Sequence, residues 1–146
     1  MVKRTSFGTA DCPVARSVDA VGDWWSLLIV RDAFDGSRRF GEFQRSLGVA
    51  KNILSARLKA LADNGILELV PAGAHHEYAL TAKGEALFPV IVALRQWGEA
   101  FSFEPGEPHS ELLDRRDGKP LQPLEVHAAD GRRVTHADTE VQKLSG

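Results

Sequence analysis

The chain has 146 residues, 43% of them apolar, which is typical of one globular domain with a substantial core. Eighteen basic and 20 acidic residues give a formal net charge of -2, so no chain-wide positive charge indicates a nucleic-acid partner. The single cysteine, Cys12, excludes an intrachain disulfide and a cysteine-based zinc cluster. The chain lacks an apolar run of membrane-spanning length and its start, Met1 to Asp11, is polar, so we expect a cytosolic protein that does not enter membranes.

Two helices are predicted at the N-terminal end. The first covers residues 12–21, with Asp11 as its expected N-cap and Gly22 as its end. Asp23 is then expected to cap a strongly apolar helix from Trp24 to Phe34. A helix with so little polar surface belongs in the middle of a fold.

A helix, a tight turn and a second helix come next. The first of this pair covers Arg39 to Leu47, and Gly48 is expected to break it. The second runs from about Ala50 to Asp63, until Asn64 and Gly65 stop it. Its inward side chains are expected to be Ile53, Leu54, Leu58 and Leu61.

Two alternating runs after this helix predict a β-hairpin. The runs are Ile66 to Val70 and Glu77 to Leu80, and the loop between them is expected to have a tip from Pro71 to Ala74. Together these elements predict a mainly α fold with a small β wing, the order of a winged helix-turn-helix.

Charge is distributed unevenly along the chain. Residues 36–60 contain six basic residues against the single acid Glu42, a local balance of +5 that leaves -7 for the rest. Such a basic helix pair in an acidic protein indicates a surface for phosphates. A merely solvated helical face is the alternative interpretation.

The segment after the wing predicts a long helix with an unusually apolar surface. It runs from a cap at Thr81 to about Phe101, with a kink or a late start expected at Pro89. One stripe consists of Val90, Leu94, Trp97 and Phe101. Pairing with a second copy of the chain would bury this stripe, so we expect a homodimer; burial in the core of one chain is the alternative.

The remainder of the chain has the composition of a linker and a series of turns. Asp117-Gly118 and Asp130-Gly131 are turn signals between short alternating runs, which predict a C-terminal extension with small hairpins. The predicted organisation is an N-terminal arm at 1–11, a DNA-binding and dimerisation domain at 12–101 and the extension at 102–146. His109, His127 and His136 are too scattered to indicate a metal site, and no cofactor is expected.

Several strings carry a family resemblance through their order and spacing over residues 12–101. They are Cys12-Pro13-Val14, the run from Gly22 to Ile29, Arg38 to Phe43, Leu54 to Leu61, Asn64 to Leu67 and Tyr78 to Gly84. Together they resemble the HxlR-type bacterial transcriptional regulators. The resemblance implies a winged helix-turn-helix related to the MarR group, a homodimer built from terminal helices, and binding to a palindromic operator, with repression as the commoner outcome.

The residues expected to face DNA fall into two groups. Lys51, Asn52 and Ser55 occupy the exposed N-terminal half of the second helix, which enters the major groove in helix-turn-helix proteins. The second group is expected to hold phosphates without reading sequence, and consists of Arg38, Arg39 and Lys59.

Three further residues have two interpretations each. Arg57 would contact phosphate or form a buried salt bridge, since it lies close to the inward face of its helix. His75 and His76 would contact the neighbouring minor groove or the DNA backbone, or belong to a simple exposed loop.

Two places are candidates for sensing a signal. Cys12 resembles the N-terminal cysteine of redox-responsive members of the family, and the helix start favours its thiolate; the alternative is a small buried apolar side chain. Because no second cysteine is present, an oxidant or electrophile would have to link subunits or form an adduct. A small aromatic effector is the other hypothesis, in the space near Trp24, Trp25, Phe88 and Trp97, where simple core packing is the alternative.

Two other classes of function compete with DNA binding. A winged helix can serve as a protein-interaction module without DNA readout, but such a module would not need the local charge of +5. An enzyme is not expected, because the sequence shows no nucleophile elbow, phosphate loop or metal-ligand spacing.

Overall fold

The structure is a computed structural model that describes residues 6–144. The first five residues of the predicted arm and the last two of the extension lie outside this range. The chain divides into two compact units, one ending at Ile91 and one beginning at Val92. The domain boundaries expected from the sequence stay a prediction.

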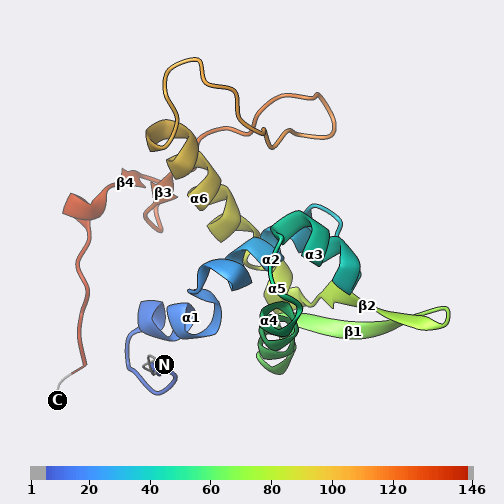
Figure 1. Cartoon of the computed structure of the whole chain (residues 1–146). Coiled ribbons are helices and arrows are strands. Elements are labelled where there is room, and N and C mark those ends of the chain that lie inside the picture. Colours follow the sequence, from blue (N-terminus) through green and yellow to red (C-terminus); the bar gives the residue numbers. More distant parts are fainter. Residues whose placement is uncertain (1–5, 145–146) are drawn as a thin grey trace. The chain divides into compact units, whose positions relative to one another are not determined.

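The first unit contains four helices, a hairpin and a short fifth helix (Figure 1). Their bounds are α1 Pro13–Val21, α2 Trp24–Phe34, α3 Phe40–Leu47, α4 Lys51–Asp63, β1 Leu67–Ala72, β2 His75–Leu80 and α5 Ala82–Glu85. This mainly helical fold with a small antiparallel sheet is the predicted winged helix-turn-helix.

The core of this unit forms where α2, α3 and α4 meet. Ile29 and Val30 of α2 and Phe43 of α3 are completely buried. Leu54, Leu58 and Leu61 of α4 are also completely buried. Burial of side chains this size contributes about 1.5–3 kcal/mol each, which explains why these three helices hold one arrangement.

The predicted inward face of α4 is wrong at one position. Ile53 is exposed at 38%, whereas Leu54 and its two partners one and two turns later are buried. Ile53 directly precedes Leu54, and successive residues on a helix diverge by about 100°, which places Ile53 at the edge of the face that the buried leucines define.

The helix ends show why the elements start where they do. The Asp23 carboxylate accepts a hydrogen bond from the Ser26 backbone N–H at 2.9 Å and so caps α2, as predicted. The N-cap of α1 is Cys12, not Asp11, and it makes no side-chain cap bond, so the Asp11 prediction is wrong. Gly48 ends α3 with φ of 63°, a left-handed conformation that favours glycine.

The wing is longer and tighter than predicted. Strands β1 and β2 pair in antiparallel register from Leu67 with Leu80 to Ala72 with His75. The four-residue tip expected at Pro71–Ala74 is therefore wrong. Only Gly73 and Ala74 form the turn, and Gly73 has φ of 63°, as a two-residue hairpin loop requires.

The long helix predicted after the wing is broken in two. Thr81 caps α5, its Oγ1 accepting from the Gly84 backbone N–H at 3.1 Å, and α5 ends at Glu85. Helix α6 begins at Phe88 and ends at Phe101, with Pro89 in its first turn. The late start expected at Pro89 is confirmed, because proline fits a first turn and not a helix interior.

The second unit begins within α6 and continues through the extension. The first Asp-Gly turn is closed by a single bridge between Leu113 and Pro120. The second separates β3 Val126–His127 from β4 Arg133–Val134, which pair antiparallel. A 3₁₀ turn, η1 His136–Asp138, comes after β4. Gly118 and Gly131 have φ of 70° and 94°, as expected for the turn positions.

Candidate nucleic-acid interface

The N-terminal half of α4 presents a row of uncommitted polar side chains. Lys51, Asn52 and Ser55 are exposed, and within residues 6–144 none of their side chains takes part in a hydrogen bond or ion pair. Such groups are free to meet base edges or phosphates. The buried leucines on the other side of the helix fix which face is outward.

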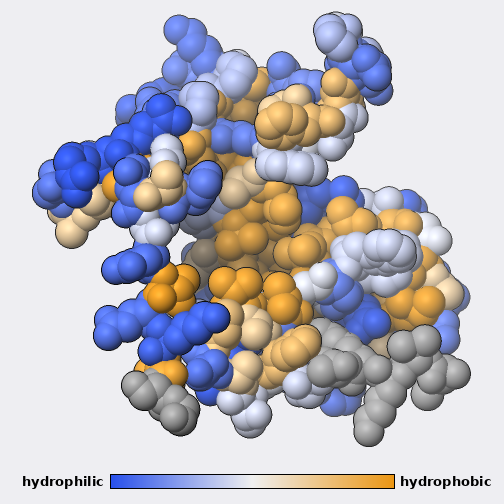
Figure 2. Space-filling view, turned by 90° about the vertical axis from the view of Figure 1, so that its left-hand side faces the viewer, coloured by the Kyte–Doolittle hydropathy of each residue, from blue (hydrophilic) through white to orange (hydrophobic). Residues whose placement is uncertain are grey.

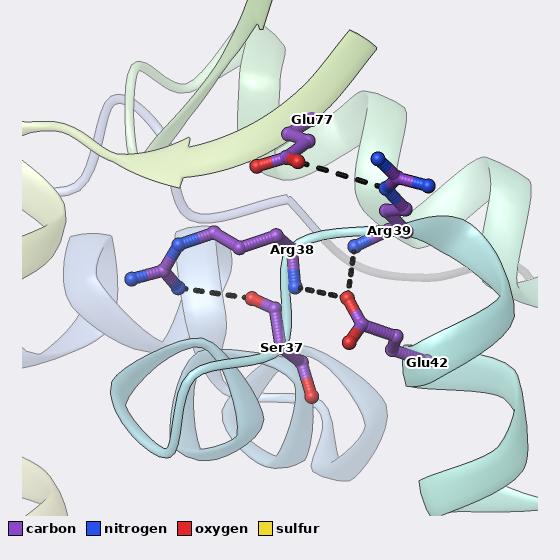
Figure 3. A network of polar contacts seen from close by, with 5 residues as sticks. All are labelled: Ser37, Arg38, Arg39, Glu42 and Glu77. Carbon is purple, nitrogen blue, oxygen red and sulfur yellow. Dashed lines mark hydrogen bonds and ion pairs between the residues drawn. The ribbon is translucent and has the colours of Figure 1, made fainter. Parts of the chain in front are cut away.

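The start of α3 carries a polar network that the sequence did not reveal (Figure 3). The Glu42 carboxylate accepts hydrogen bonds from the backbone N–H groups of Arg38 and Arg39, at 3.0 and 2.9 Å. Glu42 stands three residues after the N-cap Arg39, as the glutamate of a capping box does, but Arg39 makes no side-chain cap bond, and the serine or threonine that marks a capping box in a sequence is absent.

This arrangement changes the acidity of Glu42. The backbone N–H groups of Arg38 and Arg39 stabilise the carboxylate and hold the pKa of Glu42 below its usual value. Arg45 and Arg39 lower this pKa further through their charge. In its charged form, the Glu42 side chain therefore stabilises the N-terminal end of α3, the first helix of the pair.

The side chains of Arg38 and Arg39 have different partners. The Arg38 guanidinium Nη1 donates to the backbone oxygens of Ala33, at 2.8 Å, and Ser37, at 3.0 Å. It is thus already engaged at the end of α2, and its proposed phosphate contact stays a prediction. Arg39 is more exposed, and its Nε lies 3.6 Å from the Glu77 carboxylate on β2.

Glu77 was not singled out in the sequence. Its contact with Arg39 connects the wing to the helix pair, as does the hydrogen bond from the Tyr78 backbone N–H to the Arg38 oxygen, at 2.7 Å. Only the strand register brings Glu77 beside α3, and no local pattern indicates that register.

The remaining basic residues of α4 are paired. Arg57 Nε lies 3.6 Å from Asp23 Oδ1, and both side chains are partly buried. This is the ion pair considered for Arg57 as the alternative to phosphate. Lys59 is exposed and bonds Asp63 one turn later at 2.7 Å. An exposed pair of this kind is worth little, so the Lys59 ammonium can exchange Asp63 for a phosphate.

The two histidines stand at the far end of the hairpin. His75 and His76 belong to β2 instead of a loop, and both are exposed. Residues 66–80 contain Glu68 and Glu77 but no lysine or arginine. The imidazoles are therefore the only side chains of the wing that can carry positive charge.

The candidate sensing residues lie in separate places. Cys12 is exposed, which contradicts its interpretation as a small buried side chain. Trp24 and Trp25 meet edge to face with ring centres 6.4 Å apart, while Phe88 packs on Phe34. Trp97 contacts Phe101 in the second unit. The structure does not unite the four predicted effector residues in one cluster within either unit, and the effector hypothesis stays a prediction.

The stripe predicted on the last long helix is exposed in the single chain. Figure 2 shows apolar residues at the molecular surface. Trp97 is exposed at 62% and Phe101 at 73%, and Val90 and Leu94 are exposed as well. Burial within one chain is therefore wrong for this stripe.

Two classes of site are absent from the part of the chain that the structure covers. Residues 6–144 bring no three histidine, cysteine, aspartate or glutamate residues together as metal ligands. No helix in the same range is long and apolar enough to cross a membrane.

Comparison with known proteins agrees with this architecture. A family model described as HxlR-like helix-turn-helix matches residues 20–105. An uncharacterised HTH-type transcriptional regulator of Mycobacterium bovis, Mb3122, is 38% identical over 125 residues, which is 84% of this chain and 79% of the relative.

Solved structures extend the similarity. The crystal structure of PA1607, a proposed transcription factor, is 55% identical and covers 95% of this chain and 99% of that chain, with a TM-score of 0.91. The redox regulator HypR in its reduced form is 30% identical and covers 61% of this chain and 92% of that chain, with a TM-score of 0.55. The Mycobacterium relative is named as a transcriptional regulator, PA1607 as a transcription factor and HypR as a redox regulator; none of them is named as an enzyme. The chain belongs to the HxlR-like helix-turn-helix family of DNA-binding transcriptional regulators.

Proposed function

We propose that this protein is a cytoplasmic, sequence-specific repressor that binds a palindromic operator as a homodimer. The observation that carries the proposal is the row formed by Lys51, Asn52 and Ser55, exposed and uncommitted at the start of α4. A helix N-terminus with these side chains suits the major groove: an asparagine amide matches adenine and a lysine reaches guanine or phosphate.

The flanking groups supply the contacts that set register. Arg39 and Lys59 are exposed cations, each paired with one carboxylate among residues 6–144, and both would bind phosphates. Arg38 would bind a phosphate through its remaining N–H groups. His75 and His76 would connect the wing to the DNA backbone beside the groove. Arg57 acts mainly through Asp23, since its guanidinium is tied to that carboxylate.

The homodimer rests on the stripe of Val90, Leu94, Trp97 and Phe101. Four exposed large apolar residues along one side of a helix favour a partner surface of the same kind. A homodimer carries two α4 helices, which is why the operator should have two-fold symmetry.

The signal proposed for this repressor is an oxidant or electrophile at Cys12. Its thiol is exposed at the start of α1, and HypR, named as a redox regulator, is 30% identical to this chain. A modified Cys12 would have to carry an adduct or a bond to another chain, because the sequence contains no second cysteine.

Selection of genomic fragments bound by the purified protein, together with footprinting, tests the proposal. We expect protection of a two-fold symmetric sequence, and affinity that falls steeply with salt as phosphates are neutralised. Equal affinity for all fragments would refute sequence-specific recognition, and no binding to any fragment would favour the protein-interaction module.

A further inference from the structure

Helix α6 has two faces with different chemistry. The apolar stripe from Val90 to Phe101 lies on one side. Val92, Arg95, Gln96 and Glu99 recur three and four residues apart and lie on the other, because each residue advances the helix by about 100°. The opposite face is where the C-terminal extension is attached.

Polar side chains of α6 hold the extension in place. Arg95 Nη1 donates to the Ser110 backbone oxygen at 3.1 Å and to its Oγ at 3.0 Å. The Gln96 amide donates to the Gln122 oxygen at 3.2 Å and accepts from the Leu124 N–H at 2.7 Å. These bonds fix two separate parts of the extension and leave a space between them.

That space is a cavity of about 450 Å³ within the second unit. Its apolar walls come from Val92 and Ala100 on the helix and from Leu112, Pro120, Leu121 and Pro123 on the extension. Cavities of several hundred cubic ångströms with mainly apolar walls are the usual size for small organic ligands.

The charges around this cavity narrow the ligand class. Its lining contains one guanidinium, from Arg95, and two carboxylates, from Glu99 and Glu111. Arg95 is committed to Ser110, and Glu99 lies 3.5 Å from His109 Nδ1. Glu111 has no hydrogen bond or ion pair among residues 6–144, and with two carboxylates against one guanidinium the lining has a formal charge of -1.

We propose that this cavity binds a small organic amine, with an aromatic body against the apolar walls and its ammonium beside Glu111. The site lies behind the α6 stripe and involves neither Cys12 nor the aromatic residues near α2. It goes beyond the proposed function, since ligand binding here does not depend on DNA recognition.

Titration calorimetry of the full chain with three probes that share one ring system tests the ligand class. The probes are pyrenemethylamine, pyrenemethanol and pyrenecarboxylate. We expect saturable binding of one amine per chain, weaker binding of the alcohol and weakest binding of the carboxylate. Tightest binding of the carboxylate, or no saturable binding of any probe, would overturn the proposal.

Variants locate the binding. Ala100→Trp fills the cavity from an exposed helix position and should lower amine affinity by about tenfold or more. Ala93→Trp places the same side chain on α6 outside the cavity lining and should leave affinity unchanged. Equal affinities of the two variants would show that the amine binds elsewhere.

The charge at the rim is tested separately. Glu111→Gln should weaken amine binding by about threefold and leave alcohol binding unchanged, as expected for an exposed ion pair. An equal loss for both probes would contradict an ammonium beside Glu111. Circular dichroism on each variant confirms that a loss of binding is not a loss of fold.

Discussion

Arg57 on α4 faces Asp23, the residue that caps α2, with its Nε 3.6 Å from the Asp23 Oδ1 atom. The same carboxylate accepts hydrogen bonds from the Ser26 backbone N–H at 2.9 Å and from its hydroxyl at 2.6 Å. One side chain therefore starts the central helix and joins it to the helix that presents Lys51 and Asn52.

Two substitutions at Asp23 separate its roles. Asparagine is as good an N-cap as aspartate but cannot form the ion pair with Arg57, whereas alanine loses both. We expect Asp23→Ala to lower the free energy of unfolding by about 1–2 kcal/mol. Asp23→Asn should lower it by about 0.5 kcal/mol. Urea denaturation measures both, and equal losses would mean that the cap contributes nothing.

Removing the proposed groove contacts should sharply reduce sequence discrimination. Lys51→Ala with Asn52→Ala would remove the two proposed base contacts, worth about 1–3 kcal/mol each, so selectivity for the operator over random DNA should fall by about 100-fold. Residual salt-sensitive binding should remain through Arg39 and Lys59. Lys143→Ala, which removes a positive charge from the extension, is the control in the same gel-shift titration. Unchanged operator selectivity in the double variant would refute the assignment of α4.

The α6 stripe should determine the oligomeric state. Light scattering at micromolar concentration is expected to give twice the chain mass of 16.0 kDa for the wild type. Leu94→Glu places a charge within the stripe and should give monomers, since a buried unpaired charge is costly. Ala100→Glu adds the same charge outside the stripe and should stay dimeric. A monomeric wild type would contradict the proposed homodimer.

The Glu42 carboxylate should make stability depend on acid. Its folded-state pKa is lowered below 4.5 by the backbone N–H groups of Arg38 and Arg39, so its contribution is present above that value and is lost as pH falls through the folded pKa. Below pH 4.5 the thermal midpoint of the wild type should therefore fall more steeply than that of Glu42→Gln. Glu68→Gln, an exposed carboxylate on β1, is the control. Parallel curves for wild type and Glu42→Gln would show that this cap has no effect on folding.

Cys12 should carry any response to oxidants. Cys12→Ser should bind the operator as tightly as the wild type but keep that affinity after diamide treatment, which should alter wild-type binding. Mass spectrometry of the treated wild type should detect an adduct or a link between chains at residue 12. Identical diamide responses in both proteins would leave the exposed thiol without a sensing role.

Local sequence signals predicted most of the fold, but not the contacts between residues that lie far apart in the sequence. The period of Leu54, Leu58 and Leu61 identifies a helix and its buried side, because burial follows the helical repeat. Ile53 was misplaced, since an apolar residue at the edge of that face can be exposed at little cost. The turn at Gly73 is shorter than predicted because proline at 71 is tolerated at its place in β1.

The candidate site shows the same division. The exposed face of α4 follows from the buried leucines, so Lys51, Asn52 and Ser55 could be named from the sequence. The partners of Arg38 and Arg39 could not, because no residue pattern marks the Ala33 oxygen at the end of α2 as an acceptor, and Glu77 becomes a neighbour of Arg39 only through tertiary packing.

Gly84 joins the wing to α5 more tightly than a loop would. A methyl group on its α-carbon would lie 2.2 Å from the Ile66 backbone oxygen, so α5 is seated directly on the entry to β1. The Lys83 ammonium bonds the Asn64 oxygen beside it, at 2.6 Å. The base of the hairpin and α5 are therefore in direct backbone contact, and a displacement of α5 would move the wing with it.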